Sequence, residues 1–154
     1  MRTSIITIIF LWLLCTAFNC ENKNCHKYIG LINNTDIDVY IKGVTIHDTS
    51  GFASLFPNPI TDDTYNVKPH TKNKTGLMRR SCIESNIVNF YRVYIFDANV
   101  LATVSWSTIA KNHIVLQRYD LTKEDLQRLD WEITYPPNEA MKDVKMYPPY
   151  NPPY

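Results

Sequence analysis

The chain has 154 residues and a formal net charge of +1, and no acidic or basic block stands out. This charge pattern gives nucleic-acid binding no electrostatic support and does not call for a polyanionic partner. Glycine is scarce, whereas the ten tyrosines, three tryptophans and many β-branched residues favour strands. We therefore predict a mainly β fold: a single sandwich-like domain of antiparallel strands, with one or two short helices near the C-terminus.

Residues 1–19 predict a secretory signal peptide. Arg2 precedes an apolar run from Ile5 to Leu14, which is the layout of an export signal. The run is too short to span a bilayer, which needs about 20 apolar residues. It also lacks the polar face that a helix at the edge of a globular core would show. We therefore expect the protein to leave the cytoplasm.

Cys20 is the predicted site of lipid attachment, and residues 20–25 are the predicted tether. The preceding "AFN" resembles a bacterial lipobox, which usually has an aliphatic residue at Ala17 and Gly, Ala or Ser at Asn19. Cys15 fits that pattern less well. Several acyl chains on one cysteine would hold the domain on a membrane, since a single chain binds only weakly. Plain cleavage and an uncleaved N-terminal anchor remain alternatives.

Two further cysteines, Cys25 and Cys82, remain in the exported chain. Two thiols in an oxidising compartment most often pair, so we predict a disulfide. Two separate buried thiols are the alternative. The spacing of cysteines and histidines matches no paired zinc-ligand pattern, so we predict no metal site.

We place the domain at residues 26–137, and its first half predicts four strands. Residues 26–48 predict a hairpin, since "NNTD" supplies turn chemistry between two alternating segments. Residues 49–64 predict a long polar connection, followed by a short strand that Pro69 ends. The best strand prediction lies in residues 89–106. Tyr91, Val93 and Ile95 alternate there with Arg92, Tyr94 and Phe96, and the run is apolar enough for a central strand of a sheet.

The second half predicts two helical segments, each followed by a strand. Ser105 is the expected N-cap of one or two helical turns, and residues 114–120 predict a strand. Thr122 and Asp125 have the spacing of a capping box at the start of a helix. Residues 131–137 then predict a final strand that the prolines end, and Arg118 is placed to pair with Asp120 or Asp125 at the strand-to-helix corner.

The segment "IVLQRYDLTKEDLQRLDWEITYPP", from Ile114 to Pro137, resembles a family of small, uncharacterised lipoproteins of Bacteroides-type bacteria. In that family an "RYDL" turn, a "DLQ" helix and a "W.ITYPP" strand recur in this order. "NNTDIDVYI" and "VYIFDA" followed by "SWSTI" resemble its earlier segments, while "GFASLFPNPI" departs from it. The resemblance implies an outer-membrane or other envelope lipoprotein with no established activity, and it supports Cys20 as the acylated residue.

Residues 138–154 form a predicted proline- and tyrosine-rich tail. Such a segment cannot pair as a central strand and favours extended conformations. We expect it to pack across the domain as a strap, with a free docking peptide as the alternative.

No sequence motif predicts catalysis. The chain has no G-x-S-x-G, S-x-x-K, H-E-x-x-H or glycine-rich phosphate loop. We therefore predict a non-enzymatic protein without a cofactor. A small periplasmic hydrolase with acids such as Asp97 or Asp120 is one alternative, and an inhibitor or immunity-type protein is another.

The expected role is binding or structural, at the membrane surface, towards another envelope protein or a glycan. Aromatic side chains dominate such contacts. The candidate contact residues are Trp106, Tyr147, Tyr150 and Tyr154.

Overall fold

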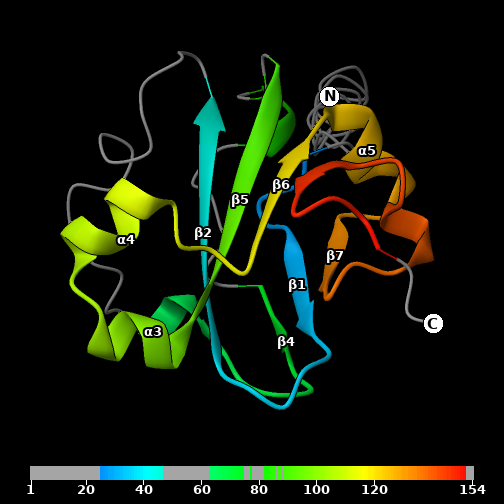
Figure 1. Ribbon diagram of the computed structural model, residues 1–154. Helices are drawn as coiled ribbons and strands as arrows, with labels where there is room; N and C mark the ends of the chain where they lie inside the picture. Colours follow the sequence, from blue (N-terminus) through cyan, green and yellow to red (C-terminus); the bar gives the residue numbers. More distant parts are fainter. Residues whose placement is uncertain are drawn as a thin grey trace, which may run out of the picture.

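The computed structural model describes residues 25–46, 63–74, 77, 82–85, 87 and 89–151. The predicted signal peptide, Cys20, Tyr154 and most of the predicted connection lie outside these residues. Within the described part, two β-sheets enclose a hydrophobic core, and short helices lie on both sides of the larger sheet (Figure 1). The prediction of a mainly β, sandwich-like fold is confirmed.

The larger sheet has five strands, all paired antiparallel. In order across the sheet these are β3 (Asn66–Val67), β2 (Val39–Ile46), β5 (Phe90–Asp97), β6 (Gln117–Leu121) and β8 (Lys145–Tyr147). The smaller sheet contains β4 (Lys72–Asn73), β1 (Gly30–Asn33) and β7 (Glu132–Tyr135). Its β1–β7 pair is parallel, which departs from the all-antiparallel expectation.

The predicted hairpin at residues 26–48 is wrong, because β1 and β2 belong to different sheets. Asn33, at the end of β1, is fully buried. Its side-chain amide donates to the carbonyl oxygens of Ile37 at 2.8 Å and Val67 at 3.1 Å, and its Oδ1 accepts from the Thr35 amide. These bonds fix a turn that carries the chain from one sheet to the other instead of back along the same sheet.

The central strand is confirmed as β5, which pairs with β2 on one side and with β6 on the other. Tyr91, Val93 and Ile95 point from it into the main core. Gly43 lies on the same face of β2, where a Cβ atom would overlap the Tyr91 ring. A glycine at this position therefore leaves room for a large aromatic side chain between the sheets.

Two helices follow β5 and cover part of the outer face of the larger sheet (Figure 1). Asp97 ends the strand and caps α3 (Ala98–Thr103), a helix that the sequence did not predict. Ser105 caps α4 (Trp106–Asn112), as predicted. Ile109 of α4 packs against Tyr94 and Phe96 of β5 in a second, smaller core.

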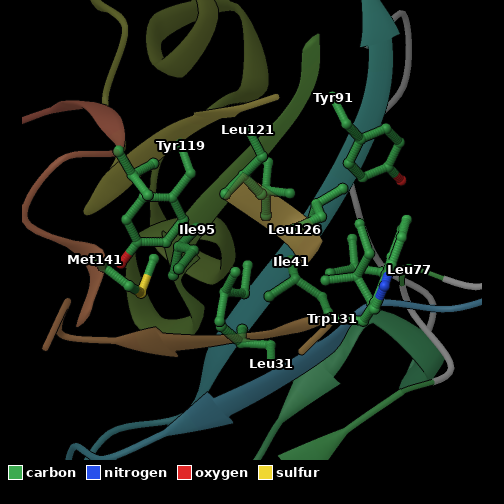
Figure 2. Close-up of a cluster of buried hydrophobic side chains, with 14 of the residues drawn as sticks. Leu31, Ile41, Leu77, Tyr91, Ile95, Tyr119, Leu121, Leu126, Trp131 and Met141 are labelled. Atoms are coloured by element: carbon green, nitrogen blue, oxygen red, sulfur yellow. The ribbon is translucent and has the colours of Figure 1, made fainter. Parts of the chain in front are cut away.

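The main core joins residues from both sheets and from α5 (Lys123–Arg128), as Figure 2 shows. The predicted capping box of Thr122 and Asp125 is present. Leu126 of this helix is fully buried. The buried Tyr119 hydroxyl donates to the carbonyl oxygen of Thr134 at 2.7 Å, which ties β6 to β7 across the core.

Residues 138–151 of the predicted tail pack against the domain as a strap. The strap contains the 3-10 helix η4 (Glu139–Met141), and two further 3-10 helices, η1 (Asp63–Tyr65) and η3 (Ile83–Ser85), lie elsewhere in the described residues. Met141 and Val144 enter the main core, and β8 then adds an edge strand beside β6. The Gln117 side chain donates to the carbonyl oxygen of Pro148 at 2.7 Å and holds the end of the strap.

The predicted disulfide between Cys25 and Cys82 is confirmed, with 4.9 Å between the two Cα atoms. It ties Cys25, ahead of β1, to Cys82, which directly precedes η3.

Candidate functional site

The outer face of β5, β6 and β8 carries two polar rows that run across the strands. Tyr94, Arg118 and Tyr147 are direct neighbours in one row. Arg92, Asp120 and Lys145 are neighbours in the next row. Because alternate residues of a strand point to opposite faces, these side chains gather on the face away from the main core.

Part of this face is hollowed. We call the depression the arginine hollow, and its volume is ≈ 370 Å³. Its wall on the helix side is the end of α4, where His113 ends the helix in the left-handed conformation with φ 51°. Its lining residues are Arg92, Tyr94, Asn112, His113, Val115, Arg118 and Tyr147.

One buried carboxylate faces two arginines at this hollow. Asp120 accepts from Arg92 Nε at 2.5 Å and from Arg92 Nη2 at 2.8 Å, in a two-pronged pair. Arg118 Nε lies 3.6 Å from Asp120 Oδ1, too far for a hydrogen bond. The predicted pairing of Arg118 with Asp120 is therefore present only as a loose ion pair, while Asp125 pairs with Arg128.

Arg118 Nε is buried, and it has no hydrogen-bond acceptor among the residues that the structure describes. A buried donor left without an acceptor costs about 1–3 kcal/mol. Arg92, Arg118 and Lys145 outnumber Asp120 on this face, so positive charge is in excess there. The rest of the Arg118 side chain reaches solvent, with 32% of its surface exposed.

Tyrosines flank Arg118 on both neighbouring strands. Burial raises the pKa of Tyr94, and the nearby Arg92 opposes that shift without cancelling it. Tyr94 is therefore neutral at physiological pH and keeps its hydroxyl proton. Tyr147 is 57% exposed, and the Arg118 guanidinium lies 5.9 Å from the centre of its ring.

The three predicted contact residues that the structure describes have separate surroundings. Tyr147 lines the arginine hollow. Trp106 is half-buried and meets Phe96 edge-on, with 5.9 Å between ring centres, so it stabilises the smaller core. The Tyr150 hydroxyl donates to Glu139 at 3.0 Å, and Tyr154 lies outside the described residues.

A second depression, of ≈ 420 Å³, lies beside the disulfide, and we call it the histidine hollow. His26 Nδ1 lies 2.5 Å from Glu84 Oε1, and the His26 ring stacks on Trp131 with 4.0 Å between centres. Burial raises the pKa of Glu84, but its hydrogen bonds with His26 outweigh burial and leave the pKa below its ordinary value. The Ser85 hydroxyl in the same hollow donates to the carbonyl oxygen of Cys82 at 2.8 Å.

The two acids considered for a hydrolase both have structural partners. Asp97 accepts from the amides of Asn99 and Val100 at the start of α3. Asp120 is held by Arg92. Each carboxylate therefore has a role in the fold that accounts for its position.

No family model, no curated protein and no solved structure matches the chain. Across the described ranges, histidines, cysteines and acids form no group of three or more that would hold a metal ion. None of the helices in the described part has the length and apolar character needed to cross a membrane.

Proposed function

We propose that the protein is an exported, lipid-anchored envelope protein that binds a ligand in the arginine hollow without transforming it. The leader and the position of Cys20 support the anchor. The outer membrane is the expected location, by resemblance to the lipoprotein family named above.

The disulfide supports export. Disulfides form and persist in oxidising compartments, such as the bacterial periplasm and the cell surface. Cys25 follows Cys20 by only a few residues, and its disulfide joins the start of the domain to Cys82. A lipid on Cys20 would thus hold the folded domain close to the membrane surface.

The observation that supports binding most directly is the state of Arg118. The fold gains no hydrogen bond from its buried Nε within the described residues. A ligand carboxylate would pair with the exposed part of the Arg118 side chain, which lines the hollow on a face where positive charge is in excess.

The anchor is tested by mass spectrometry of the membrane fraction from the native organism or a bacterial host. The expected N-terminus is Cys20 carrying acyl chains. Cys20→Ala should release the protein from membranes, whereas the matched control Cys15→Ala should leave it anchored. A protein that begins at Met1, carries no lipid and remains in the cytoplasm contradicts the proposal.

A further inference from the structure

We infer that the ligand of the arginine hollow is a sugar unit carrying one carboxylate, of the uronic-acid type. This inference rests on the proposed binding function and names the chemistry of its ligand.

The charge of the hollow favours an anionic ligand. Arg92 commits Nε and Nη2 to Asp120, whereas Arg118 Nε has no acceptor within the described chain. The planar arginine fork matches a carboxylate with two parallel hydrogen bonds. Lys145 neighbours Asp120 on β8 and adds a further positive charge to this face, so the face attracts an anion.

The side chains that flank Arg118 favour a ligand with a sugar ring. Tyr94 and Tyr147 are the direct neighbours of Arg118 on β5 and β8. The exposed ring of Tyr147 can pack against the C–H face of a pyranose. Tyr94 is 2% exposed and packs in the smaller core, so it only borders the hollow. The Asn112 side chain on the α4 wall offers both a donor and an acceptor for sugar hydroxyls.

The size of the hollow limits the ligand to something short. Its volume of ≈ 370 Å³ lies near the lower end of the range for small-molecule sites, about 300–1,000 Å³. One or two sugar units fit this range better than a folded partner surface does. An acidic residue at the end or branch of a glycan meets both the size and the charge.

The test is calorimetric titration of the full mature protein in a detergent that has no sugar headgroup. The probes are methyl glucuronide, the neutral methyl glucoside and acetate. Methyl glucuronide should bind at least about tenfold more tightly than either other probe, because only it supplies both the carboxylate and the ring. In the unsubstituted protein, NMR shift changes on binding should centre on Tyr94, Arg118 and Tyr147.

Variants then assign the contacts. Arg118→Gln should weaken methyl glucuronide binding by at least about tenfold, and Tyr147→Ala by a smaller factor. Lys74→Gln removes one positive charge next to the other sheet and should leave the affinity unchanged. Arg118→Lys keeps the charge without the fork and should fall between wild type and Arg118→Gln.

The outcomes separate this inference from the proposed function. Acetate binding as tightly as methyl glucuronide overturns the sugar ligand and leaves an anion-binding protein. Equal binding of the glucoside, no binding of any probe, or unchanged affinity in Arg118→Gln also overturns the inference. Lipid attachment at Cys20, measured separately, decides whether the envelope anchor stands in each case.

Discussion

The two hollows have similar volumes, ≈ 370 Å³ for the arginine hollow and ≈ 420 Å³ for the histidine hollow, but opposite internal chemistry. In the histidine hollow, His26 bonds to Glu84 through both its ring and its backbone amide. In the arginine hollow, two cations share one carboxylate, and a buried donor lacks an acceptor in the described chain. The comparison teaches that the two hollows differ in unmet hydrogen bonding and hardly differ in volume.

The histidine hollow borders the main core, because Trp131 belongs to both. Trp131 is 6% exposed and belongs to the main hydrophobic cluster, yet its ring also stacks on His26. Its backbone has φ 59°, following Asp130 at φ 50°. Such conformations cost about 1–3 kcal/mol each, and burial of the indole ring against the core offsets this cost.

The largest expected effect is the loss of stability when the disulfide beside the histidine hollow is removed. Replacing both Cys25 and Cys82 by serine should lower the free energy of unfolding by about 4 kcal/mol, because the bond closes a loop with a sequence separation of 57 residues. Denaturant unfolding under non-reducing conditions measures this change. Wild-type protein treated with a reductant should match the double variant, and a loss below about 1 kcal/mol would contradict the expected role of the bond.

The second-largest effect is expected when the carboxylate at the arginine hollow is replaced. Asp120→Asn should lower the free energy of unfolding by about 2–3 kcal/mol, since it removes the buried partner of Arg92. The same change should tighten methyl glucuronide binding, because a competing carboxylate is gone. The control Asp143→Asn, at an exposed position, should change stability by less than about 0.5 kcal/mol. Weaker ligand binding in Asp120→Asn would contradict the assigned competition.

A pH profile tests the hydrogen bonds between Glu84 and His26 in the histidine hollow. The folded-state pKa of Glu84 lies below its ordinary value of 4.5, so Glu84 contributes stability above that value and loses it as the pH falls through the folded pKa. At pH 7, Glu84→Gln should cost on the order of 1 kcal/mol, and the difference from wild type should disappear in acid. The same substitution at the exposed Glu124 is the control. A difference that persists unchanged at low pH would contradict the pairing.

The smallest expected effect is the most informative. Arg118→Met should change the free energy of unfolding by less than about 1 kcal/mol, because the arginine forms no hydrogen bond through its buried Nε. Thermal unfolding measures it. The matched control Arg92→Met should cost clearly more, since it strands Asp120. If the two variants are equally destabilised, Arg118 has a structural role and the distinction between the hollows fails.

Local signals in the sequence predicted local structure well. The caps at Ser105 and at Thr122 with Asp125 are confirmed, as is the alternation of Tyr91, Val93 and Ile95. Helix α3 was missed because its cap, Asp97, lies at the end of an apolar strand whose pattern runs into the helix. The hairpin prediction was wrong because turn residues specify a bend and do not specify which strand comes next in a sheet.

The candidate site could be predicted only in part. Tyr147 was named from its exposed aromatic character, whereas Arg92 and Arg118 were not named as site residues. The polar positions of β5 and β6 were visible as alternation, but nothing in either segment shows that Tyr94, Arg118 and Tyr147 are neighbours. That placement requires the register of three strands from separate parts of the chain.

The sequence by itself determined the caps and the central strand, because both depend on residues that are neighbours in the chain. It also predicted the disulfide, from two cysteines in the predicted exported chain, and the export signal, from the apolar leader. Only the tertiary structure decided that the chain crosses between sheets at Asn33, that the proline-rich strap adds an edge strand, and that Arg118 lies between two tyrosines. The physical reason is that strand partners are chosen by the surfaces they bury together. Those surfaces come from segments that are distant in the chain.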